Sequence, residues 1–438
     1  MNWLWATGGL LVLLTCGALS LHQPGEYIIG DAMHINLFVG FVAASVVVYL
    51  LAVAASRHRN AGRGAVWLVL TVAVLMRVGP LLGPPFLSSD VFRYVWDGRV
   101  QAAGINPYRY IPVDPALSAL RDAAVYPNIN RADYAPTIYP PVAQMVFAAV
   151  GVAGGGVTCM KLAMVGFEAL AIYCLLRLLA LAGLPAERVL IYAWNPLPVW
   201  AFAGNGHVDA MVGAFIALAL LLRAKSRDGW AGVALGGAIL VKFLPVVVAP
   251  ALWRRKGGWS LALACAVTIF VLYLPYLSVG AKVFGFLGGY RDEEGLDSGS
   301  GFWLLAWLER FAPLPAAAGT IYTMAALLVL ACVAAWIALV RQPNDPVSLG
   351  AASGVLMALL TVAISPHYPW YFCWLAIPAV LAPYRALTWL ASSPIVLYLD
   401  IHDDRAIWPS VIYIPAILLA IADWRWRPRL FQPLEGRS

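Results

Sequence analysis

Charged residues are scarce in this chain of 438 residues, because Asp, Glu, Lys and Arg together make up only 12%. Soluble globular domains carry about 25% charged residues. Apolar residues reach 62% and come in runs of about 20, the length that a helix needs to cross about 30 Å of hydrocarbon. The composition excludes a soluble enzyme. It predicts an all-α, polytopic integral membrane protein in which 1–438 form a single transmembrane domain.

Motifs for common cofactors are also missing. The six cysteines form no C-x-x-C pair and lie in or at the edge of apolar runs, so neither a disulfide framework nor a metal site is expected. The six histidines do not have metal-ligand spacing, and the chain lacks a phosphate-binding glycine loop and a nucleophile elbow. The net charge of +7 comes from basic residues in short connectors, which is typical of membrane topology and indicates no nucleic-acid partner.

About twelve membrane spans are predicted from the apolar runs. They lie near 3–21, 35–55, 64–82, 158–181, 188–203, 208–223, 258–277, 315–340, 347–364, 369–384, 387–400 and 407–423. The connectors that should face the cytoplasm under the positive-inside rule are marked by Arg57, Arg59, Arg63, Lys225, Arg227, Arg254, Arg255, Lys256, Arg425, Arg427 and Arg429. Both termini are therefore expected in the cytoplasm.

Two further apolar stretches do not fit as full crossings. Trp230–Trp253 has basic residues on both sides and is interrupted by Lys242 and Pro245, which predicts a hairpin of two short helices that returns to the cytoplasmic side. Pro141–Gly156 is expected to dip in from the outer face. Irregular backbone at membrane depth must be buried in protein or line a cavity. The two re-entrant stretches therefore predict a polar, hydrated cleft.

The longest connector, Gly83–Pro140, has 58 residues with five Asp and five Arg. The predicted topology makes it extracytoplasmic, and a loop of this length is usually functional. Ser89 is a suitable N-cap, Gly104 a suitable C′ residue and Pro107 a stop signal. These signals predict a helix over about 89–103, and we interpret 83–140 as the catalytic loop.

Four residues of this predicted helix share one face. Asp90, Arg93, Tyr94 and Asp97 fall at i, i+3, i+4 and i+7. We expect a short amphipathic helix at the membrane interface, with this acidic face toward the cleft. The alternative is that Arg93 and Asp97 form only an i,i+4 ion pair on a solvated face.

Two connectors carry polar residues that are candidates for substrate binding. In G-N-G-H-V-D (204–209), His207 and Asp209 should lie at the outer surface. They could bind substrate or only cap helix ends. In S-P-H-Y-P-W-Y (365–371), His367 should lie at an outer helix junction among aromatic residues. A lone histidine in such a place is more often structural than catalytic.

Charges inside apolar runs need partners. A charge at mid-depth costs about 2.5–3.5 kcal/mol on insertion scales. Lys242 in the hairpin therefore needs an anion, which could be a ligand phosphate. Glu168 lies in a predicted span near Lys161, and a buried pair between these two is the simplest explanation.

Three motifs in the long connector resemble those of a known superfamily. D-V-F-R-Y-V-W-D (90–97), A-G-I-N-P-Y (103–108) and Y-P-P-V-A (139–143) resemble the glycosyltransferase-C superfamily over about 60 residues. They are similar in particular to the polyprenyl-phosphate-mannose-dependent mannosyltransferases, including the catalytic subunit that adds the first mannose to GPI anchors. Phe92 stands where D-x-D motifs have a second acid, so a divalent cation gains little support. Two helices, where many members have one, precede the helix that leads into the loop.

The resemblance implies a reaction and a set of roles. The protein would move a hexose, expected to be mannose, from a polyprenyl-phosphate donor to a glycan or glycolipid acceptor, with inversion, at the outer face of the cell (inner) membrane. Such a transfer needs a base and cations for the leaving phosphate, but no general acid. Asp90 is the candidate base, and its place at a helix N-terminus suggests an ionised carboxylate. The other candidates are catalytic Asp97 and substrate-binding Arg93, Tyr94, Arg99, Tyr139, His207, Asp209, Lys242 and His367.

A transporter or flippase of about a dozen helices, for a lipid-linked sugar or a small solute, is the alternative. Its substrate site would lie near the midplane of the membrane, where Lys242 and Glu168 would fit. The 58-residue outer connector would then have no role.

Overall fold

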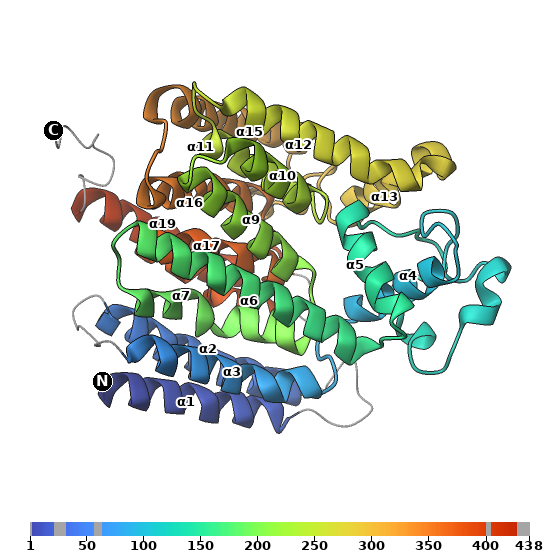
Figure 1. Ribbon diagram of the computed structural model, residues 1–438, viewed down its shortest axis with the longest axis horizontal. Helices are drawn as coiled ribbons and strands as arrows, with labels where there is room; N and C mark the ends of the chain where they lie inside the picture. Colours follow the sequence, from blue (N-terminus) through green and yellow to red (C-terminus); the bar gives the residue numbers. More distant parts are fainter. Residues whose placement is uncertain (1, 22–31, 57–63, 400–403, 427–438) are drawn as a thin grey trace.

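The computed structural model describes residues 2–21, 32–56, 64–399 and 404–426, and every regular element in these ranges is helical (Figure 1). Eight of the described helical segments are long and apolar enough to cross a membrane. They are α1 (Asn2–Leu19), α2 (Ala32–Ser56), α3 (Ala65–Leu82), α6 (Val157–Leu181), α12 (Gly258–Tyr273) with its continuation η6 (Leu274–Phe284) and α13 (Leu287–Glu293), α15 (Ala318–Trp336) with η7 (Ile337–Arg341), α16 (Pro346–Ile364) and α19 (Ile407–Trp426). The prediction of an all-α polytopic membrane protein is confirmed.

Three of the twelve predicted spans are broken into short helices, and a fourth, 208–223, is one continuous helix of 16 residues. The run 188–203 begins within η3 (Ala186–Val189) and continues as α7 (Leu190–Ala193), α8 (Pro196–Pro198) and the π-helical turn η4 (Val199–Gly204). The continuous helix is α9 (Asp209–Ala224). The other two broken runs are η8 (Pro369–Leu375) with α17 (Ala376–Leu381), and α18 (Arg385–Leu390) with η9 (Ser393–Leu399). Prolines break several of these runs because they lack the N–H that continues a helix. Most of their residues are buried within the protein, so their apolar character reflects the protein core, which hydropathy alone does not distinguish from lipid contact.

The segment 228–254 is a hairpin, as predicted. It consists of α10 (Asp228–Ile239), a turn, η5 (Leu244–Val248) and α11 (Ala249–Leu252). Its two ends meet, because Arg254 Nε donates to Asp228 Oδ2 over 2.9 Å. The tip of the hairpin reaches α5 (Pro141–Val152), where Val142 N donates to Leu240 O over 3.0 Å.

The stretch Pro141–Gly156 does not complete a crossing, which also agrees with the prediction. Lys161, near the start of α6, donates from Nζ to the carbonyl oxygens of Pro80 and Gly83, both over 2.7 Å. The end of α3 and the start of α6 therefore lie side by side. The intervening chain leaves the bundle and returns at the same end.

The long connector contains α4 (Asp90–Ala102), η1 (Pro115–Leu120) and η2 (Tyr126–Asn128), all at the end of the bundle marked by α4 and α5 in Figure 1. The bounds of α4 agree with the predicted helix, and Gly104 takes the positive φ of +76° expected at C′. Ser89 makes no side-chain cap. Instead, the Asp90 N–H lies 3.4 Å from Ser88 Oγ.

The alternative that placed Arg93 and Asp97 on a solvated face is wrong. The residues of α4 from Val91 to Gly98 are all buried, on both faces. Helix α5 covers α4 so closely that a Cβ on Gly98 would lie 2.2 Å from Phe147 O, and one on Gly151 would lie 2.3 Å from Gly98 O. Two facing glycines thus allow the backbones to touch, which a sequence profile of α4 alone cannot show.

Glu168 is paired, but not with Lys161. Its carboxylate accepts from Arg77 Nη2 over 2.7 Å and from Arg77 Nε over 3.1 Å. Arg77 Nη1 also donates to Ala193 O over 2.9 Å. Lys161 lies two turns before Glu168, roughly 10 Å along the helix axis, and instead binds the carbonyls at the end of α3. The predicted Lys161–Glu168 pair is therefore wrong.

The basic connectors gather at the end of the bundle remote from α4. Arg223 at the end of α9 donates to Leu252 O over 2.8 Å and to Pro343 O over 2.9 Å, which brings three connectors together. The start of α9 is roughly 24 Å away at 1.5 Å per residue. Helix α1 begins and α19 ends on this same side, opposite α4 and α5 (Figure 1). Of the basic residues used for the topology prediction, Arg57, Arg59, Arg63, Arg427, Arg429 and the side chain of Arg425 lie outside the described residues.

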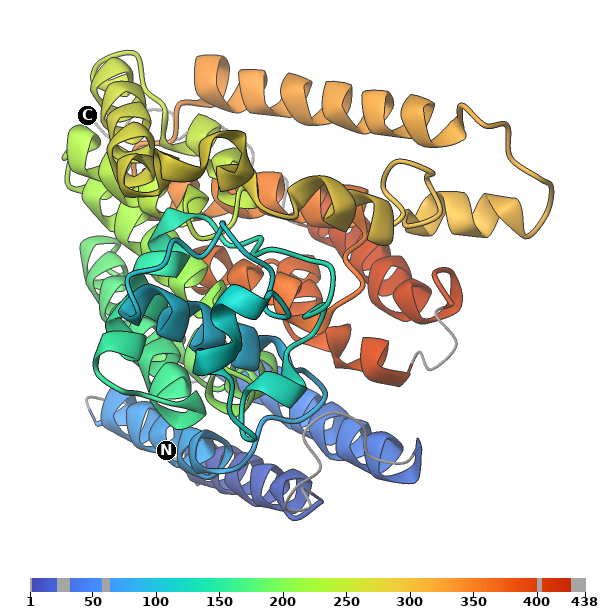
Figure 2. The ribbon, with the colours of Figure 1, turned by 90° about the vertical axis from the view of Figure 1, so that its right-hand side faces the viewer.

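Helix α15 lies at the periphery of the molecule, separated from most other helices (Figure 2). Only 6% of its best membrane-spanning window is buried within the protein. Between α13 and α15 the chain forms α14 (Trp303–Glu309), which with α13 covers the same end of the bundle as α4.

Candidate functional site

A cavity of about 380 Å³ lies beside the start of α4. Asp90, Arg93, Tyr139 and Lys242 all line it. The structure thus brings four of the residues predicted from the sequence to one place. They come from α4, from the chain before α5 and from the tip of the hairpin, which converge at this end of the bundle.

Asp90 is the carboxylate of this cavity. Its Oδ1 accepts from Asn130 Nδ2 over 2.7 Å, and its Oδ2 lies 3.6 Å from His207 Nδ1. The side chain is one-fifth exposed, and within the described ranges no Lys or Arg forms an ion pair with it. Burial raises the pKa of Asp90 above its ordinary value, although the Asn130 hydrogen bond and the charge of Lys242 act against the shift. From the sequence, the helix N-terminus was expected to keep Asp90 ionised. In the structure, desolvation opposes this ionisation and favours the protonated carboxyl.

Lys242 has its anionic partner within the protein. Its Nζ lies 2.9 Å from both carboxylate oxygens of Asp209, the first residue of α9. It also lies 3.8 Å above the ring of Tyr371, at a distance typical of a cation–π contact. Asp209 thus compensates the buried positive charge of Lys242, and a ligand phosphate is not required for this purpose. The ammonium group has three N–H donors, and Lys242 still lines the cavity.

His207 lies behind the wall of the cavity. Its side chain is 0% exposed, and its ring stacks on that of Trp370 with the centroids 3.8 Å apart. Trp370 in turn stacks on Tyr368 at 4.6 Å. Trp370 and Tyr368 line the cavity and His207 does not, so His207 faces Asp90 from within the protein.

Arg93 and Asp97 form the predicted i,i+4 pair, but on a buried face. Arg93 Nε donates to Asp97 Oδ1 over 2.9 Å, and Gln144 Nε2 donates to Asp97 Oδ2 over 2.9 Å. Arg93 Nη1 also donates to Ala135 O over 3.1 Å. Asp97 is 2% exposed and does not line the cavity. Its position fits a structural role beside Arg93 better than a catalytic one.

Two further predicted residues lie away from the cavity. Arg99 donates to Asp122 over 2.5 Å in a partly exposed pair. Tyr94 is buried and stacks on Phe147 with the centroids 4.8 Å apart. Its hydroxyl lies 3.4 Å from that of Tyr139, so only Tyr139 of this pair reaches the cavity.

Sequence reasoning missed Asn130, Arg131 and Tyr290. Asn130 and Arg131 face α4 and α13 from the long connector, where Arg131 Nε donates to Glu293 Oε2 over 2.7 Å. Tyr290 lies in α13, and its hydroxyl is 2.7 Å from that of Tyr371. No local pattern marks Asn130 or Arg131. In the sequence, the only indication of this side of the cavity was the cluster of aromatic residues at 368–371.

His367 lines a second cavity, of about 260 Å³, which shares Tyr139, Lys242, Tyr290 and Tyr371 with the first. Its Nδ1 lies 2.7 Å from Glu294 Oε2. Aliphatic and aromatic side chains make up most of the remaining lining. A third cavity of about 340 Å³ between α15 and α16 shares Arg291, Leu296 and Ile364 with the second. Three adjacent cavities therefore extend from the region of Asp90 toward the periphery at α15, and apolar side chains make up most of the lining of the second and third.

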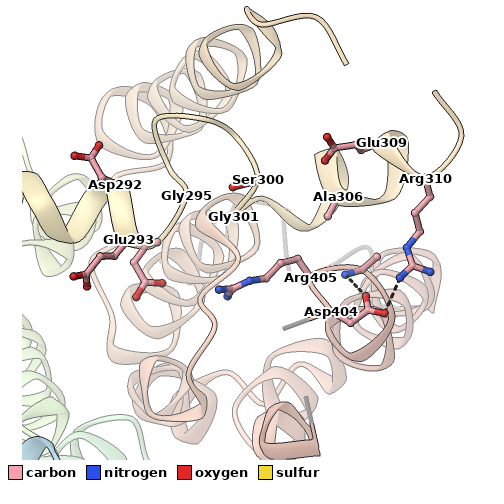
Figure 3. Close-up of a pocket in the computed structure, with 12 residues that line it drawn as sticks. Asp292, Glu293, Gly295, Ser300, Gly301, Ala306, Glu309, Arg310, Asp404 and Arg405 are labelled. Atoms are coloured by element: carbon pink, nitrogen blue, oxygen red, sulfur yellow. Dashed lines mark hydrogen bonds and ion pairs between the residues drawn. The ribbon is translucent and has the colours of Figure 1, made fainter. Parts of the chain in front are cut away.

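A fourth cavity, of about 610 Å³, lies among α13, α14 and the start of α19 (Figure 3). Its lining includes five carboxylates, Asp292, Glu293, Glu294, Glu309 and Asp404, and two guanidinium groups, Arg310 and Arg405. Arg310 Nη2 donates to Asp404 Oδ2 over 2.6 Å. Glu293 joins this cavity to the first one, because it accepts from Arg131 and, over 2.9 Å, from the hydroxyl of Tyr134.

Metal ligands are not clustered in the part of the chain that the structure describes. No three His, Cys, Asp or Glu side chains there are placed to hold a metal ion. The cations nearest to the cavity of Asp90 are instead side chains of Arg and Lys.

These features define a class: a polytopic helical membrane protein with a carboxylate-bearing cavity at one end of its bundle. Residues 11–254 match the family model "Alpha-(1->6)-mannopyranosyltransferase, N-terminal domain". This match covers more than half of the chain, so the chain belongs to that family. The resemblance to membrane mannosyltransferases is thereby confirmed.

A curated relative supports the assignment. The chain is 26% identical over 242 residues to alpha-(1->6)-mannopyranosyltransferase A of Mycobacterium tuberculosis (strain ATCC 25618 / H37Rv). The aligned part covers 52% of this chain and 47% of the relative, so the chain matches about half the length of that protein. No solved structure matches the chain.

Proposed function

We propose that this protein is a membrane mannosyltransferase that uses a polyprenyl-phosphate-linked donor. The accessible carboxylate of Asp90 carries the proposal, because it lies beside cationic side chains in a member of a mannopyranosyltransferase family. Its direct neighbours, Asn130 and His207, are neutral groups. A carboxylate that is not neutralised by a cation keeps its capacity to accept a proton.

In the proposed reaction, Asp90 accepts the proton of an acceptor hydroxyl. The hydroxyl oxygen forms a bond to the anomeric carbon, while the bond from that carbon to the phosphate oxygen breaks. The phosphate leaves with the electron pair, and attack from the opposite side inverts the anomeric centre. Lys242 and Arg131 are the cations that we assign to the departing phosphate, and Trp370 provides an aromatic wall for the sugar.

We assign the prenyl chain of the donor to the apolar path between the region of Asp90 and α15. The second and third cavities are lined mainly by apolar side chains and share Ile364 and Leu296. Their path runs from the cations beside Asp90 to a peripheral helix that has few buried residues. A donor whose phosphate lies near Lys242 and whose prenyl chain lies in this path would keep the end of that chain in contact with the bilayer.

We assign the acceptor glycan to the acidic cavity of Figure 3. The excess of carboxylates over guanidinium groups there disfavours an anionic phosphate, whereas carboxylates and arginines both bind sugar hydroxyls well. Glu293 lies between this cavity and that of Asp90. All of the lining residues lie beyond 254, outside the family match.

The proposed orientation places α4 and α5 outside the cytoplasm, in the cell (inner) membrane, with both termini cytoplasmic. The gathering of the connectors with Lys225, Arg227 and 254–256 at the remote end supports it under the positive-inside rule. Since nucleotide sugars are cytoplasmic, a site on the outer side calls for a lipid-linked donor.

The proposed function is tested by incubating the purified protein with radiolabelled polyprenyl-phosphate-mannose and a membrane extract. We expect labelled glycan or glycolipid product, formed without added nucleotide sugar. A protein with Asp90→Asn serves as the control for contaminating transferases. Label that enters product equally with both proteins, or only from GDP-mannose, would contradict the proposal.

The donor path predicts a dependence on chain length. Ile364→Trp places a large ring where the second and third cavities meet. Overfilling such a space costs about 1–3 kcal/mol, which corresponds to about a 5- to 150-fold higher KM for a long-chain donor. A short-chain analogue should be used as well as by the wild type. Leu328→Trp on the exposed face of α15 is the matched control, and equal effects of the two variants on both donors would exclude this path.

A further inference from the structure

The carboxylate of Asp90 has a different neutral neighbour at each oxygen. Asn130 Nδ2 donates to Oδ1 over 2.7 Å, whereas His207 Nδ1 faces Oδ2 from 3.6 Å. Neither ring nitrogen of His207 has a hydrogen-bond partner among the described residues, although both are buried. A buried donor without a partner is unfavourable. The carboxylate of Asp90, with Oδ2 3.6 Å from Nδ1, is an acceptor that could satisfy it.

The ring of His207 is held in place on several sides. It stacks on Trp370, which is itself stacked on Tyr368. The backbone N–H of His207 donates to Ala201 O over 3.0 Å. Gly206 before it has φ +70°, and a Cβ there would lie 3.0 Å from Val91 Cγ2 of α4. The connector is thus packed against α4 near Asp90, so a small movement of Asp90 is enough to close the 3.6 Å gap.

We propose that His207 is the positioning residue for Asp90: its neutral imidazole, protonated on Nδ1, donates a hydrogen bond to Oδ2 when the acceptor binds. This rests on the proposed function of Asp90 as the base. The proton of the acceptor hydroxyl moves to Asp90, and His207 keeps its own proton throughout. His207 thereby touches the base and not the substrate, in contrast to the role expected from the sequence.

The chemistry of the surroundings favours a neutral imidazole. Burial lowers the pKa of His207, and the positive charge of Lys242 lowers it further. A neutral donor orients a carboxylate without cancelling its charge, whereas a cationic partner would lower its basicity. The charged groups that act on Asp90 are Lys242, Arg131 and Asp209, and none of them forms an ion pair with it.

Two substitutions separate the hydrogen bond from the stacking. His207→Phe keeps a ring against Trp370 but removes the donor, and His207→Asn places an amide N–H near the position of Nδ1. We expect His207→Phe to lower kcat about 10–100-fold with the KM for donor unchanged. The acidic limb of its kcat profile should move to higher pH, because Asp90 in the acceptor complex loses a donor that stabilises its charged form. His207→Asn should recover most of the rate and the wild-type acidic limb.

The proposal is overturned if both variants are equally slow with an unchanged acidic limb, which would indicate a role in packing, or if both are as fast as the wild type. A second measurement does not depend on turnover. In the ¹⁵N spectrum of histidine-labelled protein, the signal that His207→Phe removes should belong to a neutral ring protonated at Nδ1, and Asp90→Asn should shift it. A ring protonated at Nε2 would overturn the proposal even if no mannose is transferred. An inactive wild type with a ring protonated at Nδ1 would count against the proposed function alone.

Discussion

Asp90→Asn should lower mannosyl transfer by about 10²–10⁴-fold, the usual effect of losing a general base. The amide keeps the shape of the side chain and its place beside Asn130 but cannot accept the proton. Because burial raises the pKa of Asp90, the wild type should lose activity on acidification at a higher pH than the ordinary aspartate pKa of about 3.9. The deprotonated base disappears as the pH falls through this raised value. Initial rates with a radiolabelled donor, measured across pH, check both statements.

Two other aspartates of the same connector serve as comparisons. Asp122→Asn disrupts the partly exposed pair with Arg99 and should change the rate little. Asp97→Asn weakens the buried pair with Arg93, so it should reduce the yield of folded protein more than the rate per folded molecule. If Asp90→Asn turns over normally and Asp97→Asn is inactive although folded, the two roles are reversed. Normal rates in both would remove this loop from the active site.

Glu168→Gln should destabilise the fold by about 3–5 kcal/mol, the usual cost of leaving one member of a buried ion pair alone. Glu168 and its partner Arg77 are 1% and 6% exposed, so water cannot replace the lost carboxylate charge. The single variant should therefore show a lower unfolding temperature in detergent. The double variant Arg77→Met/Glu168→Leu should recover much of the loss, because similar-sized apolar residues often replace a buried pair without cost.

The exposed pair of Arg291 and Asp297 is the matched control for this experiment. Asp297→Asn should leave the unfolding temperature unchanged, since exposed pairs contribute little. If Glu168→Gln unfolds at the wild-type temperature, the pair is hydrated in the folded protein and does not hold α3 to α6. If the double variant is no better than the single one, hydrogen bonds from Arg77 to the backbone carry the stability instead.

The sequence by itself determined the features that depend on neighbours along the chain. The apolar runs predicted the membrane class, and the stop signals at Gly104 and Pro107 predicted the end of α4. Basic residues on both sides of 230–253 predicted the hairpin, whose ends meet at Asp228 and Arg254. Such features follow from composition, helix capping and the unequal distribution of positive charge across membranes. The motif around Asp90 likewise indicated the family.

Only the tertiary structure decided which charges meet. Lys242 finds Asp209 at a separation of 33 residues, and Arg77 finds Glu168 at a separation of 91. Asn130 reaches Asp90 across 40 residues. No periodicity encodes contacts of this range, because they depend on how separate helices pack. For the same reason the sequence could not distinguish apolar runs that face lipid from those buried in the core, and it could not show that His207 lies behind Asp90 and not in the cavity.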